Sequence, residues 1–100
     1  MLRIIEETSA GKGFELGRSL DDLAREGARR MLVSALDAEV GEYVERYRSE
    51  RDEAGRALVM RNGKARPRKV TLGAGTVAVT APRVNDRRER EQFTSRILPP

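Results

Sequence analysis

The sequence KVTLGAGTVAVTAP, residues 69–82, decides how the second half of this chain folds. Val70 and Leu72 alternate with polar residues, a glycine-rich turn follows, and Val77 and Val79 then resume the alternation. Alternation on both sides of a glycine turn is typical of a β-hairpin with one apolar face. Pro82 has no N–H for the ladder and is predicted to end the second strand. Because a lone hairpin is marginal in water, its apolar face must pack on another element.

Before the hairpin, apolar residues follow the three-and-four spacing of one face of an α-helix. We assign residues 19–50 to this amphipathic helix and residues 1–18 to a flexible leader. Ser19, followed three residues later by Asp22, predicts a capping box at the helix start. Gly27 and Gly41 each cost about 1 kcal/mol relative to alanine in a helix interior. The pattern therefore allows one helix, straight or kinked near Gly41, or two shorter helices.

Acidic residues on the polar face of this helix precede basic residues by four positions, a spacing worth about 0.2 to 0.5 kcal/mol per ion pair. The predicted pairs are Asp21 with Arg25, Glu26 with Arg30, and Glu42 with Arg46. These pairs give three acidic residues of the helix a role without any catalysis.

The length of the helix raises the question of what covers its apolar stripe. Thirty helical residues are about 45 Å long, whereas a compact chain of this size is only about 34 Å across. We therefore expect the helix to kink or to pair with a second copy, as a homo-oligomer. The predicted oligomerisation residues are Leu32, Leu36, Val40 and Tyr43.

Composition excludes several classes of protein. The chain has no cysteine and no histidine, which rules out disulfides, zinc sites built on those residues and Ser-His nucleophilic pairs. The longest aliphatic run, residues 57–60, is far shorter than the roughly 20 residues of a membrane helix. No apolar segment of signal-peptide length occurs near the N-terminus, so we expect a cytoplasmic protein without a membrane partner. The expected fold class is α+β.

Positive charge is concentrated in the second part of the chain. Residues 1–60 hold 10 Lys and Arg against 13 Asp and Glu, and residues 61–100 hold 10 against 3. The sequence RNGKARPRK, residues 61–69, places five cations around an Asn-Gly turn and a stiffening proline. We interpret residues 51–68 as a basic loop that grips phosphates of duplex DNA. The predicted DNA-binding residues are Arg61, Asn62, Gly63, Lys64, Arg66, Arg68, Lys69 and Arg83, with Arg87, Arg88 and Arg90 beyond them.

Two other interpretations of this charge stay open. The loop could be an ordinary solvated cationic surface kept for solubility. Alternatively, the charge could serve structured RNA, although the low aromatic content of 4% argues against a base-stacking platform for single strands.

Five motifs in a fixed order carry a resemblance to a known family. They are AEVGEYV at residues 38–44, VMRNG at 59–63, PRKV at 67–70, TAPRVND at 80–86 and FTSRILPP at 93–100. Together they make the chain similar to the N-terminal region of Mutator-type bacterial insertion-sequence transposases.

The resemblance implies a DNA-binding and oligomerisation region that precedes an RNase H-like catalytic domain. In that domain three acidic residues hold a divalent metal, Mg²⁺, for DNA recombination. It follows the segment matched by residues 93–100, so we expect no catalytic residue, metal site or cofactor in this chain, and no DNA cleavage by it alone. The expected function is binding of duplex DNA at terminal inverted repeats during transposition. The alternative is a truncated dimerisation module or regulator that pairs with full-length transposase without binding DNA.

The end of the chain is predicted to be a charged tail, residues 83–100, that closes on an apolar segment. Residues 93–98 resemble the start of another packed element, and the sequence before them predicts no helix or strand against which that element would pack. We therefore expect the sequence to be part of a longer polypeptide.

Overall fold

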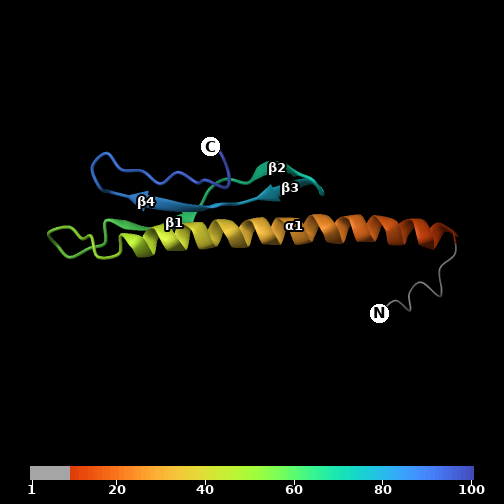
Figure 1. Ribbon diagram of the computed structural model, residues 1–100, viewed down its shortest axis with the longest axis horizontal. Coiled ribbons are helices and arrows are strands. Elements are labelled where there is room, and N and C mark those ends of the chain that lie inside the picture. The colour runs from red at the N-terminus through yellow and green to blue at the C-terminus, as the bar shows by residue number, and fades with distance from the viewer. Residues whose placement is uncertain (1–9) are drawn as a thin grey trace.

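The structure, a computed structural model, describes the backbone of residues 10–100 and the side chains of residues 19–100. One helix, α1 (Ala10–Arg46), is followed by four strands, namely β1 (Val59–Lys64), β2 (Arg68–Leu72), β3 (Gly75–Val79) and β4 (Pro82–Asp86). The strands lie along one side of the helix (Figure 1). This arrangement confirms the α+β fold class.

Helix α1 runs without interruption for 37 residues, including Gly27 and Gly41. It begins at Ala10, so the prediction of a flexible leader is wrong for residues 10–18, and residues 1–9 lie outside the described part of the chain. Residues 10–46 contain no proline, and each added residue gains one backbone hydrogen bond at little further entropy cost. The ladder therefore continues across both glycines.

On the polar face of the helix, one ion pair and the N-terminal cap differ from the sequence prediction. Ser19 lies inside the helix and cannot cap it, and Asp22 pairs instead with Arg25, which was predicted to pair with Asp21. The ion pairs of Glu26 with Arg30 at 2.9 Å and of Glu42 with Arg46 at 3.4 Å are confirmed.

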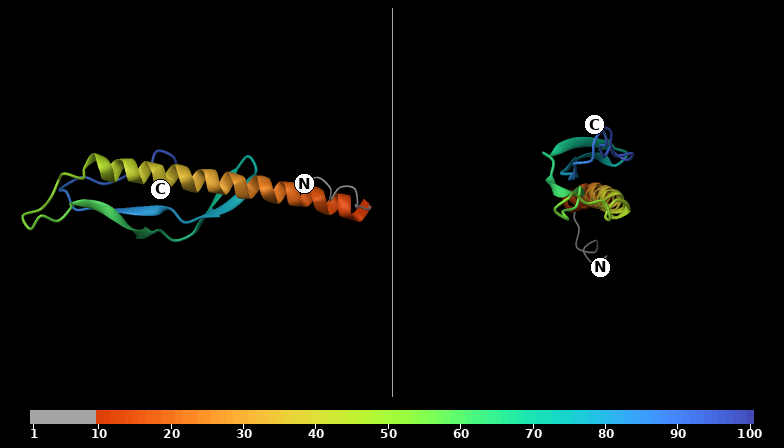
Figure 2. Two further views of the ribbon diagram at one scale, coloured as in Figure 1. Left: turned by 90° about the horizontal axis from the view of Figure 1, so that it is seen from below. Right: turned by 90° about the vertical axis from the view of Figure 1, so that its left-hand side faces the viewer.

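The strands form two antiparallel ladders, β1 with β4 and β2 with β3. The predicted hairpin is confirmed as β2 and β3, with Val70 opposite Val77 and a turn at Gly73 and Ala74. The second ladder was not predicted. Because β3 leads into β4 after only two residues, the two ladders form one long two-stranded ribbon (Figure 2).

The register of this ribbon shifts twice near its middle. Arg61 pairs with Val84 but Lys64 pairs with Pro82, so Asn62 and Gly63 together face Arg83. The Ala65 N–H donates to the Ala81 carbonyl at 2.8 Å, and Arg68 then pairs with Val79, so residues 66 and 67 together face residue 80. Such bulges bend a ribbon and increase its twist.

The bulges explain three errors of the sequence prediction. Asn62 and Gly63 form a bulge and not a chain-reversing turn, with Gly63 at φ 65°. The predicted basic loop therefore contains strand β1. Pro82 does not end the ribbon but begins β4, where it is buried, and this strand takes the first residues of the predicted charged tail.

The core lies between α1 and the inner face of the ribbon. Leu36, Val77, Val79 and Leu98 form its main cluster, and Val40 and Val59 are buried further along the helix. Leu98 belongs to the apolar segment for which no receiving element was predicted, and the core of this chain receives it. The molecule measures 68 × 25 × 18 Å, because the N-terminal part of α1 extends beyond the ribbon (Figure 1).

Candidate nucleic-acid interface

Five exposed cations gather at the bend of the ribbon. We call them the bend cations: Lys64, Arg66, Arg68, Lys69 and Arg83. Among the side chains of residues 19–100, none of the five forms an ion pair with a carboxylate, in contrast to most arginines of the helix. Their charge therefore faces solvent.

Four of the bend cations, Lys64, Arg66, Arg68 and Lys69, lie on the edge of the ribbon that is less engaged with the helix, and Arg83 lies on β4 across from them. Strands β3, β4 and β1 contact α1, and the link between β1 and β2 bows away from it (Figure 2). Alternation along β2 turns Arg68 and Lys69 to opposite faces, with Lys69 on the outer face beside exposed Thr71. Arg83 lies on the outer face of β4, and its Nε donates to the Asn62 carbonyl at 3.3 Å across the bulge.

Arg61 differs from its neighbours among the predicted DNA-binding residues. Its guanidinium donates to the Asp37 carbonyl at 3.0 Å and lies 3.5 Å from the Asp37 carboxylate. An added Cβ at Gly41 would lie 3.8 Å from the same guanidinium, so Arg61 crosses the helix surface there. Arg61 therefore joins β1 to α1: its side chain stays 48% exposed, but its charge is paired with Asp37.

Arg87 and Arg88 also form ion pairs within the chain. Arg87 donates to the Ala57 carbonyl at 2.8 Å and to Asp52 at 3.2 Å, which fixes the loop between α1 and β1. The guanidinium carbon of Arg88 lies 3.8 Å from the centre of the Tyr47 ring, and one of its guanidinium nitrogens lies 2.8 Å from an Asp86 oxygen. Neither residue extends the basic surface as the sequence suggested.

Asp86, Arg88 and Tyr43 form a hydrogen-bonded cluster on the helix side of β4. The Tyr43 hydroxyl donates to Asp86 at 2.7 Å and accepts from Arg88 at 2.8 Å. Hydrogen bonds from Arg88 hold the pKa of Asp86 far below its ordinary value, and those bonds raise the pKa of Arg88 in turn. Burial, with the Asp86 carboxylate second, raises the pKa of Tyr43. Since all three groups keep their ordinary charge at neutral pH, the cluster is structural.

Sequence reasoning missed this cluster and assigned Tyr43 to oligomerisation. The set Leu32, Leu36, Val40 and Tyr43 faces the chain's own ribbon: Leu36 and Val40 are buried there, and Leu32 packs against the core. Apolar periodicity identifies the face of a helix that is covered, but it does not say by what.

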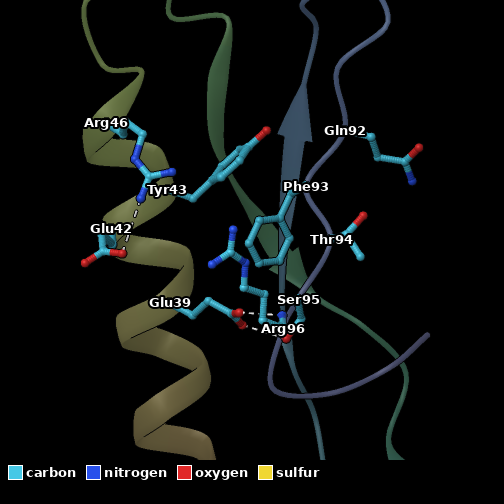
Figure 3. A pocket seen from close by; sticks show the side chains of 9 residues that line it. All are labelled: Glu39, Glu42, Tyr43, Arg46, Gln92, Phe93, Thr94, Ser95 and Arg96. Atoms are coloured by element: carbon cyan, nitrogen blue, oxygen red, sulfur yellow. Dashed lines mark hydrogen bonds and ion pairs between the residues drawn. The ribbon is translucent and has the colours of Figure 1, made fainter.

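A hollow of about 500 Å³ lies between α1 and the segment after β4 (Figure 3). Glu39 closes one end, accepting from the Ser95 hydroxyl and from the Arg96 N–H, each at 2.6 Å. The Phe93 ring packs on Tyr43 at 4.9 Å between ring centres. The hollow is lined by Glu39, Glu42, Tyr43, Arg46, Gln92, Phe93, Thr94, Ser95 and Arg96. Its polar contacts hold residues 92–98 against the helix.

The described residues offer no site for the divalent metal that the resemblance implies for a catalytic domain. No group of three or more acidic side chains converges among them. In the same described region, no helix combines the length and the apolar character needed to cross a membrane.

Comparison with protein families identifies the class of protein. The family model described as "Transposase, Mutator family" matches residues 3–99, nearly the whole chain. The chain therefore belongs to the Mutator family of transposases, which confirms the resemblance seen in its motifs. Comparison with curated proteins and with solved structures finds no match.

Proposed function

We propose that this chain is a DNA-binding part of a transposase and that the bend cations contact the phosphates of duplex DNA at the terminal inverted repeats of the element. The single observation that carries the proposal is the gathering at one bend of five exposed cations that form no ion pair with the carboxylates of residues 19–100. Guanidinium and ammonium groups left in solvent at a fixed backbone position are suited to phosphate contact.

The dimensions of the ribbon favour duplex DNA. From Lys64 to Lys69 the chain spans at most about 17 Å. Each DNA strand carries one phosphate per 3.4 Å of helix axis, so about five phosphates lie within this span. A two-stranded ribbon also fits the major groove, which is about 12 Å wide. Met60 and Asn85, which pair on the exposed face of β1 and β4, would then face the groove.

The salt dependence of binding tests the proposal. Each neutralised phosphate contributes about 0.9 to the slope of log K against log[salt], so five contacts per chain predict a slope of about −4.5. Replacing Arg66, Arg68 and Lys69 with glutamine should reduce the slope by about 3. A matched triple replacement of Arg30, Arg46 and Arg48 changes the net charge equally but lies on or just after the helix. This second variant should retain most of the slope.

Two outcomes would overturn the proposal. Equal losses in the two triple variants would mean that net charge alone drives binding, and an affinity independent of salt would exclude phosphate contact. A preference for structured RNA over duplex DNA in the same titration would favour the RNA-binding alternative.

One observation favours the second candidate function, a module that pairs with another copy of the transposase. Leu20, Leu23 and Met31 are exposed large apolar residues on the N-terminal part of α1. A chain that associates through this face and leaves DNA unbound would fit a regulator. DNA titration together with measurement of oligomeric state separates the two functions.

A further inference from the structure

Helix α1 carries two apolar faces, and the ribbon covers only one of them. At about 100° per residue, Leu36 and Val40 point to one side, and Leu20 and Met31 point roughly 180° away. Leu36 and Val40 are each 2% exposed, whereas Leu20 and Met31 are 58% and 74% exposed. The ribbon lies on a single side of the helix (Figure 2).

The exposed face has the spacing of a helix-pairing seam. Leu20, Ala24, Gly27 and Met31 follow one another at intervals of four, three and four residues, and Leu23 lies beside them. A Cβ added at Gly27 would meet nothing within 4 Å, so packing inside the chain does not require glycine there. Glycine in a helix interior nevertheless costs about 1 kcal/mol. Close approach of another backbone would account for it.

We propose that α1 packs antiparallel against α1 of a second copy of this chain, with the two-fold axis between Arg25 and Glu26. In this register Leu20 faces Met31 of the other copy, and Ala24 faces its Gly27. The two large side chains close both ends of the seam, and the two small residues let the backbones approach at its centre.

Charge selects the antiparallel orientation. Residues 20–24 carry Asp21 and Asp22, and residues 25–31 carry three arginines against Glu26. A parallel pair would set acidic segments side by side, whereas an antiparallel pair sets each acidic segment beside a basic one. The helix dipoles favour the same orientation. Since screening acts over about 8 Å, these charges set orientation more than affinity.

The extent of the contact indicates a weak dimer. With this axis, residues 10–41 of the two helices overlap over about 47 Å. A strip about 10 Å wide then gives roughly 470 Å² per copy, below the roughly 600 Å² per partner at which stable interfaces begin and in the range of weak, transient ones. We therefore expect dissociation in the micromolar range.

The pairing leaves the ribbons on the two outer sides of the dimer, facing away from each other. If the bend cations bind DNA as proposed above, the dimer can hold two separate duplexes. This consequence rests on the proposed function. The association itself does not, and it is therefore measured without DNA, so that failure of either proposal is distinguishable.

Sedimentation equilibrium of the full chain tests the association. The wild-type chain should show a monomer–dimer equilibrium at micromolar concentrations, and Leu20→Asp combined with Leu23→Asp should shift it to monomer with an unchanged circular dichroism spectrum. Met60→Asp is the matched control, because Met60 is also exposed, at 44%, but lies on the ribbon. A wild-type chain that stays monomeric at hundreds of micromolar, or a dimer that survives the double variant, would overturn the proposal.

The orientation is tested by disulfide trapping, since the chain has no cysteine of its own. In the antiparallel register, an equal mixture of Leu20→Cys and Met31→Cys chains should form a mixed cross-linked dimer on mild oxidation. Neither variant alone should cross-link, because identical positions lie about 16 Å apart along the axis and a disulfide needs Cα atoms within about 7 Å. Cross-linking of each variant with itself would indicate a parallel pair and contradict the proposal.

Discussion

Arg88 and Asp86 form the least exposed ion pair among the described side chains, with nitrogen and oxygen 2.8 Å apart and side-chain exposures of 10% and 4%. Removing the carboxylate leaves Arg88, whose side chain is only 10% exposed, with the more distant carboxylates of Glu50 and Glu91 at 3.7 Å, and it takes one acceptor oxygen from Tyr43. We predict that Asp86→Asn lowers the midpoint of thermal unfolding by several degrees, measured by circular dichroism. Asp22→Asn, in an exposed pair on the helix, should change it little.

Acid should destabilise the chain in a defined range of pH. The pKa of Asp86 is lowered from its ordinary 3.8 by Arg88, and that of Glu26 is lowered from 4.5 to about 2 by Arg29 and Arg30. A lowered folded-state pKa means that the unfolded state takes up protons first as the pH falls. Stability should therefore be complete above about pH 5 and decline below it. In Asp86→Asn the decline should be shallower, and an identical decline would show that Asp86 does not contribute to it.

Gly63 should not tolerate a side chain, because its φ is 65°. An L-residue in that conformation costs about 1 to 2 kcal/mol. We predict that Gly63→Ala lowers the free energy of unfolding in urea by about 1 kcal/mol and weakens duplex binding by altering the bulge. Gly73→Ala is the control, since a Cβ there meets nothing within 4 Å and its φ is not positive. Equal effects in both variants would contradict a role for the bulge.

Leu36 should behave as a core residue of the single chain. Truncation of a buried leucine typically costs 2 to 5 kcal/mol, and in so small a core we expect about 3 for Leu36→Ala. Met60→Ala, at an exposed position, should stay within about 0.5 kcal/mol. The free energies come from urea unfolding at a protein concentration below that of association. A loss that appears only at high concentration would instead assign Leu36 to an interface between copies.

Ser95 should hold the segment after β4 in place. Its oxygen accepts from the N–H groups of Ile97 at 3.1 Å and Leu98 at 3.0 Å, and its hydroxyl donates to Glu39. Ser95→Ala loses these bonds and should make trypsin cleavage after Arg96 several-fold faster while α1 stays intact. Thr94→Ser, an exposed neighbour, should leave the rate unchanged.

Regular periodicity made part of this fold predictable. The three-and-four spacing before residue 48 and the alternation around Gly73 are local patterns, and both produced the expected element. Strand β1 was missed because residues 59–64 have only one buried side chain, Val59, followed by exposed residues. A strand at the exposed edge of a ribbon buries few side chains, so its sequence shows little alternation of apolar and polar residues.

The sequence predicted that the candidate site is rich in cations, but not which of those cations pair with other residues of the chain. The concentration of cations at residues 61–69 is visible in the sequence, and all five of those cations are exposed as expected. Arg61 differs from the other four only because its position opposite Asp37 on the helix pairs its charge within the chain. Likewise, the residues next to Arg88 in the sequence give no indication that its guanidinium contacts Tyr43 and Tyr47.

By itself the sequence determined the long helix and the β2–β3 hairpin, the absence of cysteine and histidine chemistry, the split of charge and the family. These depend on neighbours a few residues apart or on composition. The tertiary structure alone decided which arginines form ion pairs with distant residues, which face of α1 is covered and where residues 93–98 dock. Those outcomes depend on contacts between residues tens of positions apart, such as Arg61 with Asp37 and Ser95 with Glu39, and local sequence patterns do not record such contacts.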